Sequence, residues 1–392
     1  MREKKYYYKE KEMNRRKNSP AKRILKGILL AVGVLIVLVG GLFGYLTVTE
    51  YYPEEGKRED LEINSPLEEE KAASADVREE EQAAENSPEK KAVRLVSWNI
   101  GYGALGDNAD FFMDGGKGVK TADKARVEQN LQMVSEELKS LDPDVIFLQE
   151  IDRGSSRSYN IDETALLRKD FPQMWSSFAN NFKVAFIPYP VPPIGKVDSG
   201  LLTLTKLPVS EAERIQLPCP FSWPVRIANL KRCVMLDRVS LDDGRELVLI
   251  NLHLEAYDSG EGKEKQTQML TQILNEEAQK GNSVIAAGDF NQIFSSADKG
   301  QFPAQEGKWQ AGQIDVTQID GDWQFLMDED TPSCRSLDQP YAGADHDSFQ
   351  YYLIDGFIVS GDIKVKSCET QDLGFVCSDH NPVVLEAEIP AE

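Results

Sequence analysis

The segment Val284-Ile285-Ala286-Ala287-Gly288-Asp289-Phe290-Asn291 indicates most directly how this chain folds. Its first four residues form a short apolar run typical of a buried strand, and polar residues begin where that run stops. Four similar signatures lie at or just past the ends of other apolar runs: Ser97-Trp98-Asn99, Leu148-Gln149-Glu150, Asn251-Leu252-His253-Leu254 and Ser378-Asp379-His380. Because strand ends present side chains to a shared cleft, we expect these carboxylates, amides and imidazoles to meet. Such a group can hold a hard cation beside acid–base residues, which suits cleavage of a phosphate ester.

The remainder of residues 93–390 reads as many strands with few helices. Apolar runs predict strands at 93–98, 145–148, 200–205, 234–239, 247–254, 284–287, 357–359 and 383–389. Apolar residues at helical spacing predict helices over 122–141 and 262–280. Asp242-Asp243-Gly244 predicts a hairpin turn between two of the strands. This mixture predicts an α+β fold, a layered sandwich with sheets in the middle and helices outside.

Residues 27–48 form an uncharged stretch rich in Leu, Val and Ile. At about 1.5 Å per residue, a helix of this length is long enough for a hydrocarbon core of about 30 Å. We therefore predict one transmembrane helix. The alternative is a cleaved signal peptide, but the run exceeds the usual apolar region of about 7–15 residues and no clear small-x-small cleavage site follows it.

Charge is distributed unevenly along the chain, whose formal net charge is −21. Residues 1–26 carry 11 Lys and Arg against 3 Asp and Glu, so the positive-inside bias predicts a basic cytoplasmic tail and an extracellular location for everything after the helix. Residues 49–91 contain few large apolar residues, which predicts a disordered acidic linker. Residues 92–392 hold a net charge of −20, which disfavours a nucleic-acid partner without excluding a nuclease.

The predicted location is therefore a cell membrane, crossed once. The sequence contains no N-x-Ser/Thr sequon, which favours a bacterial over a eukaryotic exported protein. Five cysteines are few for an exported domain. Cys219 and Cys233 are close enough in sequence to bridge one loop, but the sequence leaves their pairing open.

The order of the polar signatures resembles the endonuclease/exonuclease/phosphatase superfamily over about residues 93–390. The residues that carry the resemblance are Trp98-Asn99, Gln149-Glu150, His253, Gly288-Asp289-Phe290-Asn291, Asp355 and Ser378-Asp379-His380. The resemblance implies a deoxyribonuclease-I-like fold, a four-layered α/β/β/α sandwich, for a catalytic domain over residues 92–392. The chain lacks the Trp-Cys-Asp-Arg element of inositol phosphatases, which argues against that branch.

The resemblance also implies a metal site. It makes Glu150 the main ligand of Mg²⁺, with Mn²⁺ as a substitute, helped by Asn99 and completed by Asp379. Mg²⁺ prefers one or two carboxylates together with waters and substrate oxygens, so a sparse protein shell is expected. The structural alternative for Glu150 is an exposed side chain at a strand end.

The catalytic roles follow from the same resemblance. Asp289 is expected to orient and deprotonate the attacking water, and Asn291 to hold a phosphate oxygen or Asp289 itself. His253 is expected to contact the scissile phosphate and help the leaving group. His380, oriented by Asp355, is expected to stabilise the transition state as an imidazolium. The structural alternatives are an Asx turn at Asp289 and a core histidine at position 253.

Substrate contacts are expected from residues that follow Glu150, namely Arg157, Tyr159 and Asn160. Two loops are further candidates for a substrate wall: the proline-rich segment 188–193, and the segment 219–233 with its mixture of aromatic and basic residues. The alternative for the second loop is packing at a rim.

The leading hypothesis is a membrane-anchored, extracytoplasmic, Mg²⁺-dependent phosphoesterase, preferentially a phosphodiesterase. Nucleic acid, lipid headgroups and small phosphate esters all stay open as substrates, and the oligomeric state is undetermined. The alternative from another class is a non-catalytic surface binding module on the same fold. The presence of all the core polar positions argues against that alternative.

Overall fold

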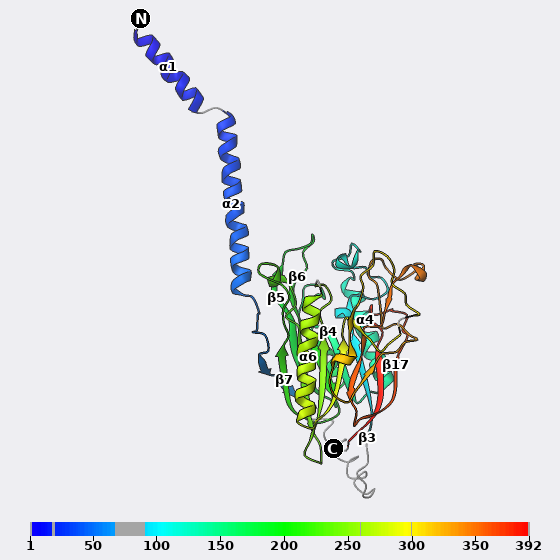
Figure 1. The fold of residues 1–392 in the computed structure, drawn as a ribbon. Helices are drawn as coiled ribbons and strands as arrows, with labels where there is room; N and C mark the ends of the chain where they lie inside the picture. Colours follow the sequence, from blue (N-terminus) through cyan, green and yellow to red (C-terminus); the bar gives the residue numbers. More distant parts are fainter. Residues whose placement is uncertain (1, 18–19, 67–90, 259, 299, 391–392) are drawn as a thin grey trace. The chain divides into compact units, whose positions relative to one another are not determined.

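The computed structural model describes residues 2–17, 20–66, 91–258, 260–298 and 300–390. The chain divides into two compact units, residues 1–50 and residues 51–392 (Figure 1). The first unit contains two helices, α1 (Arg2–Lys17) and α2 (Pro20–Val48). Within α2, the segment Lys22–Val48 is long and apolar enough to cross a membrane, and it contains the span predicted at 27–48.

The second unit is built around two seven-stranded mixed sheets. Sheet A has the order β1 (Arg58–Asp60), β7 (Val209–Gln216), β8 (Cys233–Ser240), β9 (Glu246–His253), β10 (Ser283–Asp289), β16 (Asp355–Ser360) and β13 (Trp323–Leu326). Sheet B has the order β17 (Lys364–Thr370), β18 (Val383–Ile389), β3 (Lys91–Asn99), β4 (Val145–Asp152), β6 (Gly195–Thr205), β5 (Trp175–Ile187) and β2 (Ile63–Asn64). Strand β9 pairs in parallel with β10, and β3 with β4.

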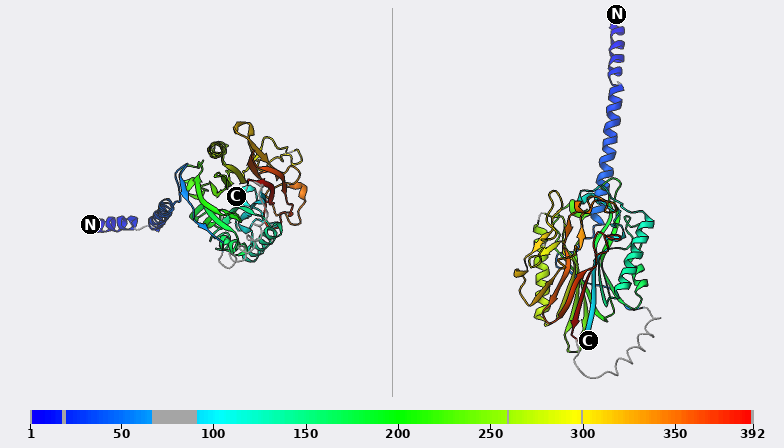
Figure 2. Two further views of the ribbon diagram at one scale, coloured as in Figure 1. Left: turned by 90° about the horizontal axis from the view of Figure 1, so that it is seen from below. Right: turned by 90° about the vertical axis from the view of Figure 1, so that its right-hand side faces the viewer.

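Helices cover the outer faces of both sheets (Figure 2). Helices α4 (Lys124–Leu141) and α5 (Glu163–Asp170) share a buried apolar cluster with sheet B, and α6 (Glu261–Gln279) shares another with sheet A. Between the sheets, Leu95 and Phe147 of sheet B meet Leu249 and Ile285 of sheet A in a third cluster. The result is the predicted four-layered α/β/β/α sandwich.

Short elements complete the domain. Two small sheets pair β11 (Gln292–Phe294) with β12 (Gly312–Ile314) and β14 (Cys334–Arg335) with β15 (Tyr351–Tyr352). The 3₁₀ turns are η1 (Gly101–Gly103), η2 (Phe112–Asp114), η3 (Val225–Ala228), η4 (Val316–Gln318) and η5 (His346–Ser348).

Helix α4 shows how local sequence decides these elements. Its apolar residues at spacings of four and three are fully buried: Val127, Leu131, Val134 and Leu138. The Asp123 side chain caps the first turn by accepting a hydrogen bond from the backbone N–H of Arg126. The helix ends at Asp142, whose backbone is left-handed with φ 43°. Apolar spacing and caps together therefore define this helix.

Every strand and both helices predicted from apolar patterns are present, and the predicted hairpin turn joins β8 to β9. The strands that were not predicted are the longer strands β5, β7 and β17 and the short strands β1, β2, β11, β12, β13, β14 and β15. Strand β5, with the sequence Trp-Ser-Ser-Phe-Ala-Asn-Asn-Phe-Lys-Val-Ala-Phe-Ile, mixes polar and apolar residues without strict alternation. Its pairing with β6 shifts register at two bulges, which breaks the two-residue period on which the prediction depends.

The disordered linker predicted over residues 49–91 is wrong for part of its length. Strand β1 pairs with β7 at the edge of sheet A, and β2 pairs with β5 at the edge of sheet B. Arg58 forms ion pairs with Glu213 and Glu276, and Leu61 packs on a small apolar cluster. Sheet edges offer unpaired backbone groups, so a segment poor in apolar residues can order by hydrogen bonding. Residues 67–90 of the predicted linker lie outside the described residues.

A buried ion-pair network joins helix α6 to sheet A and gives a testable stability prediction. Arg238 donates to Glu277 at 2.8 and 2.9 Å and also pairs with Glu213 and Glu246. Burial opposes ionisation of Glu277, but hydrogen bonds from Arg238, Lys280 and Asn282 outweigh it and lower its pKa to about 2. The ionised form therefore stabilises the fold above about pH 4.5, and this contribution is lost as pH falls towards 2.

We expect Glu277→Gln to lower the free energy of unfolding at pH 7 by about 2 kcal/mol, because it removes one partner of a buried cation. Between pH 4.5 and 2, the free energy of unfolding should also fall less in the variant than in the wild type, because the glutamine side chain has no proton to take up. Urea unfolding followed by tryptophan fluorescence at several pH values checks both results. Glu264→Gln, on the exposed part of the same helix, is the matched control. Equal stability of the two variants would contradict the prediction.

Candidate active site

Strands from both sheets end at one place and deliver the predicted polar residues there. Asn99 is the last residue of β3 in sheet B. In sheet A, Asp289 at the end of β10 pairs with His253 at the end of β9 and with Asp355 at the start of β16. His380 precedes β18, the neighbour of β3. Signatures separated by up to 281 residues therefore meet across the two sheets, as expected from their positions at strand ends.

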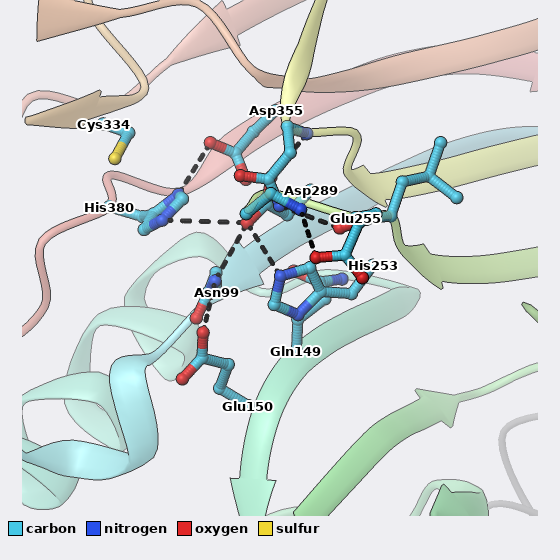
Figure 3. A network of polar contacts seen from close by, with 12 residues as sticks. Asn99, Gln149, Glu150, His253, Glu255, Asp289, Cys334, Asp355 and His380 are labelled. Carbon is cyan, nitrogen blue, oxygen red and sulfur yellow. Dashed lines mark hydrogen bonds and ion pairs between the residues drawn. The ribbon is translucent and has the colours of Figure 1, made fainter. Parts of the chain in front are cut away.

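Asp289 is the centre of the resulting polar network (Figure 3). Its Oδ2 accepts a hydrogen bond from Asn99 Nδ2 at 3.1 Å and lies 3.3 Å from His253 Nε2 and 3.8 Å from His380 Nε2. Its Oδ1 accepts a hydrogen bond from the backbone N–H of Asn291 at 2.9 Å. The carboxylate is thus held on several sides and still borders the cavity described below.

The surroundings of Asp289 favour its protonated form. Burial and the nearby charge of Asp355 raise the pKa of Asp289 to about 7, although His380 and the hydrogen bonds from Asn291 and Asn99 oppose this shift. A carboxylate whose pKa lies near neutral pH is well matched to accept a proton. The chemistry available to this side chain is therefore that of a general base.

His380 has the opposite preference. Burial alone would lower its pKa, but the charge of Asp355 and the hydrogen bond between His380 Nδ1 and Asp355 Oδ2, at 2.8 Å, hold that pKa well above its usual range. The backbone carbonyl of His380 accepts a hydrogen bond from Trp98 Nε1 at 2.9 Å, and its N–H donates to Ser378 Oγ at 3.2 Å. His380 is therefore a fixed imidazolium whose Nε2 faces Asp289.

His253 is neutral. Burial, together with the positive charges of Arg232 and His380, lowers its pKa well below its usual range. Its Nε2 lies on Asp289, while its buried Nδ1 has no hydrogen-bond partner among the described residues. The two imidazoles on either side of Asp289 thus differ in charge. His380 can offer a positive charge to a phosphate, whereas His253 can offer only a hydrogen bond.

Glu150 occupies a distorted part of its strand. Its backbone is left-handed with φ 56°, and the pairing of β4 with β6 shifts register between Leu148 and Ile151. Such backbone costs energy and recurs at functional sites. The distortion leaves the Glu150 carboxylate 3.4 Å from Asn99 Nδ2, so that the Asn99 amide lies between Glu150 and Asp289.

The predicted metal ligands provide oxygen atoms, which suit a hard cation. Glu150, Asp379 and Asn99 all border the cavity. Burial raises the pKa of Asp379 to about 6 and the negative charge of Glu150 adds to the shift, against the charge of His380. The two carboxylates repel each other in this site, and a bound divalent cation would reduce that repulsion. Gly101 leaves space beside the Asp379 carboxylate, because a Cβ there would lie 3.1 Å from Asp379 Oδ1.

Closely spaced ligand atoms form two further groups among the described residues. One group contains Cys334, Asp379 and His380, and the other contains Asp289, Asp355 and His380, with the ligand atoms of each group within 4.8 Å of one another. Glu150 belongs to neither group. Cys334, the first residue of the short strand β14, was not predicted, because a lone cysteine carries no sequence signal.

Asn291 holds the turn after β10. Its backbone is left-handed with φ 51°, and its Nδ2 donates to the carbonyl of Leu254 at 3.0 Å. Together with the bond from its backbone N–H to Asp289 Oδ1, this arrangement ties the turn to the Asp289 carboxylate.

The amides of Gln149 and Asn251 have a structural function beneath the site. Gln149 Nε2 in sheet B donates to Asn251 Oδ1 in sheet A at 2.9 Å. Asn251 Nδ2 in turn donates to the carbonyls of Leu148 and Leu202 in sheet B. These bonds connect the two sheets next to the polar network and so help to hold in place the strand ends that carry Asp289 and Glu150.

Of the three predicted substrate contacts, only Arg157 lies at the cavity. Arg157 borders the cavity, but its guanidinium binds Asp152 at 3.0 and 3.1 Å and stacks on the Tyr102 ring at 3.6 Å. Tyr159 and Asn160 do not border the cavity; the Tyr159 hydroxyl donates to the carbonyl of Ala122. The chain turns away after Arg157, which position in the sequence could not reveal.

A cavity of about 180 Å³ opens over the network. Its floor contains the polar residues described above, and its walls are largely apolar: Leu105, Phe111, Val119, Phe182, Ile187, Ile194, Leu230, Trp309, Tyr352 and Ile354. Part of the wall comes from the segment 219–233, whose terminal cysteines, Cys219 and Cys233, are both free thiols. The site can therefore take a group larger than a phosphate.

Sequence inspection missed several residues of the cavity. The Tyr257 hydroxyl donates to both carboxylate oxygens of Asp114, at 3.0 and 3.2 Å. Burial raises the pKa of Asp114 to about 7. Glu255, which also borders the cavity, accepts a hydrogen bond at 3.3 Å from Arg232, a residue of the predicted wall segment 219–233. Asp114, Tyr257 and Glu255 lie in segments without periodic patterns, so no sequence signal marks them.

Comparison with known proteins agrees with this geometry. The model of the Endonuclease/Exonuclease/phosphatase family matches residues 96–380. A search of curated protein sequences found no match. The solved structure of an endonuclease/exonuclease/phosphatase from Beutenbergia cavernae has 16% sequence identity and a TM-score of 0.50, covering 76% of this chain and 72% of that chain.

Two other solved structures have the same kind of similarity. The human Nocturnin catalytic domain with bound sulfate has 17% identity and a TM-score of 0.47, covering 78% of this chain and 96% of that chain. D. rerio TDP2 complexed with single-strand DNA product has 15% identity and a TM-score of 0.48, with coverages of 76% and 99%. Given the family match over most of its length, this chain belongs to the endonuclease/exonuclease/phosphatase family.

Proposed function

We propose that this protein is a membrane-anchored, extracytoplasmic, Mg²⁺-dependent phosphoesterase whose substrate is a phosphodiester. The observation that carries the proposal is one buried carboxylate, Asp289, held between the Asn99 amide, the neutral imidazole of His253 and the charged imidazole of His380. A base placed beside a neutral donor and a cation has the parts that hydrolysis of a phosphate ester requires.

In the proposed reaction, Asp289 accepts a proton from a water molecule. The water oxygen forms a bond to phosphorus while the bond from phosphorus to the departing ester oxygen breaks, without a covalent enzyme intermediate. The imidazolium of His380, held by Asp355, stabilises negative charge on the phosphoryl oxygens. His253 donates a hydrogen bond to the departing ester oxygen. Asn291 keeps Asp289 in place through its backbone N–H.

The proposed cation ligands are Glu150, Asp379 and Asn99, which would hold Mg²⁺ or, as a substitute, Mn²⁺. When bound, the cation supplies positive charge that polarises the phosphate. Burial, with a smaller contribution from the charge of Glu150, raises the pKa of Asp379 to about 6, and a bound cation would offset both effects, which supports this assignment.

Removal of divalent cations is expected to lower turnover by at least about 10²-fold, because the cation contributes several kcal/mol of charge stabilisation. The measurement is hydrolysis of bis(p-nitrophenyl) phosphate by the full chain in detergent, after EDTA and again after addition of Mg²⁺. Glu150→Gln should raise the Mg²⁺ concentration needed for half-maximal rate. Turnover that is insensitive to EDTA would overturn the cation dependence.

The substrate class is tested with a panel comprising single- and double-stranded DNA, RNA, a bilayer phospholipid and small phosphate esters. Hydrolysis of at least one phosphodiester, lost in the Asp289→Asn variant, supports the proposed function. A protein that binds Mg²⁺ in calorimetry but hydrolyses nothing in the panel is instead a surface binding module. The location is tested by adding protease to intact cells, which should remove the domain and leave the basic tail protected.

A further inference from the structure

The exposed large apolar side chains of residues 51–66, 91–258, 260–298 and 300–390 are concentrated around the mouth of the cavity. They are Tyr52, Met113, Phe186, Tyr189, Val191, Trp223, Val225 and Tyr257. We define the apolar rim as the four that stand on two loops without bordering the cavity itself. These are Tyr189 (67% exposed), Val191 (93%), Trp223 (54%) and Val225 (58%). An exposed apolar patch of this kind marks a binding surface.

Contacts place the rim at the cavity mouth. The loop between β5 and β6 carries Tyr189 and Val191, and its flanking residues Ile187 and Ile194 border the cavity. Tyr189 packs edge-on against Phe112, with ring centroids 5.8 Å apart. The loop between β7 and β8 carries Trp223 and Val225, and its later residue Leu230 borders the cavity. Both loops therefore form the entrance to the catalytic residues.

The charge of these loops is opposite to that of the domain. Segments 182–196 and 219–232 contain no Asp or Glu in their sequence. Of their five basic residues, Lys183 and Lys196 are exposed and Arg226 is partly exposed, whereas Lys231 and Arg232 are buried. Apolar side chains beside basic residues fit an interface of apolar chains and anionic phosphate groups, such as the surface of a phospholipid bilayer.

The chain itself limits how far this surface can be from the membrane. Only Thr49, Glu50 and Tyr51 separate the last residue of helix α2, Val48, from Tyr52. Four consecutive Cα–Cα steps extend over at most about 14 Å. The guanidinium of Arg226 lies 4.0 Å from the centroid of the Tyr52 ring, and Arg226 is a neighbour of Val225 in the rim. If α2 spans a bilayer, the chain therefore tethers Tyr52, which contacts this loop through Arg226, within about 14 Å of the last residue of α2.

We propose that the apolar rim inserts into the headgroup region of the bilayer that α2 spans, so that the cavity takes an amphiphilic phosphodiester directly from the lipid surface. This inference rests on the proposed function and gives its substrate class. The polar network meets the phosphodiester, and the apolar wall formed by residues such as Phe182, Ile187 and Leu230 meets the adjoining apolar part of the same molecule.

Insertion is measured without reference to activity. The five tryptophans are at positions 98, 175, 223, 309 and 323, so the anchor contains none and tryptophan fluorescence reports on the domain alone. The full chain is reconstituted into vesicles of phosphatidylcholine and phosphatidylglycerol with bromine-labelled acyl chains. We expect bromine to quench part of the wild-type fluorescence. Trp223→Phe should lose at least half of this quenching, whereas the control Trp323→Phe, on strand β13, should retain it.

Turnover provides the second readout. The rim variant replaces Tyr189, Val191, Trp223 and Val225 with serine. We expect it to hydrolyse bis(p-nitrophenyl) phosphate in water at the wild-type rate but to lose at least about tenfold on a phospholipid with a p-nitrophenyl phosphodiester headgroup in the vesicles. Asp242→Ser, in the exposed hairpin turn before β9, is the control and should behave as wild type on both substrates.

The outcomes separate the two proposals. Equal bromine quenching in the wild type and Trp223→Phe, or equal loss on both substrates in the rim variant, overturns the rim proposal and leaves the phosphoesterase proposal intact. A wild-type protein that hydrolyses neither substrate overturns the phosphodiesterase proposal and the substrate class inferred from it. In that event, quenching that depends on Trp223 still supports insertion of the rim.

Discussion

Asp289→Asn is expected to lower kcat by at least about 10³-fold, because the variant keeps the shape of the side chain but cannot accept a proton. The carboxylate has the position of a general base: its Oδ2 lies within 3.3 Å of His253 and 3.1 Å of Asn99, and burial raises its pKa to about 7. The measurement is hydrolysis of bis(p-nitrophenyl) phosphate at saturating substrate and Mg²⁺ concentrations.

Asp237→Asn is the matched control for this substitution. Asp237 is also a buried aspartate of sheet A, and burial raises its pKa to about 6, but it binds Ser177 and does not border the cavity. We expect this control to affect stability without changing kcat by more than about twofold. If the Asp289 variant retains near-wild-type kcat, with an unfolding midpoint like that of the wild type, another group is the base.

Asp355→Asn is expected to change the pH dependence of the reaction as well as its rate. In the wild type, the charge of Asp355 outweighs the effect of burial and raises the pKa of His380 well above its usual range. His380 therefore keeps its positive charge at pH values where a free histidine would lose it. Without the charge of Asp355, the pKa of His380 falls and the imidazolium is lost at lower pH. We expect the alkaline limb of the kcat/KM profile to move to lower pH by at least about one unit, with a rate loss of about 10²-fold at pH 8.

A purely structural role for Asp355 would reduce the rate equally at every pH and leave the limb in place. Asp355→Glu provides a rescue, because it restores the charge beside His380 Nδ1 and should return the alkaline limb towards its wild-type position. His380→Gln should remove the limb altogether, since no group then titrates there. An unchanged limb in the Asp355→Asn variant contradicts the assigned imidazolium.

The sequence by itself determined most of the long elements and the set of polar residues that meet at the candidate site. Apolar runs mark strands such as β3 and β10, and apolar spacing marks helices such as α4, because burial of one face is a local property of the sequence. Polar residues that follow such runs lie at the ends of strands, where neighbouring strands bring side chains together. The order of Asn99, Glu150, Asp289 and His380 was therefore sufficient to predict a common site. The family resemblance added expected roles that residue types alone could not give.

Only the tertiary structure decided how those groups act on one another. Whether His253 is neutral and His380 charged depends on burial and on Asp355, which is 25 residues away from His380 in the sequence. Tyr159 was expected at the substrate, but the fold turns it towards Ala122. Residues 58–60 were expected in a linker, but a sheet edge orders them through backbone hydrogen bonds, which side-chain patterns do not encode. The apolar rim likewise combines two loops that come together only because distant strands pair, so its existence depends on non-local contacts.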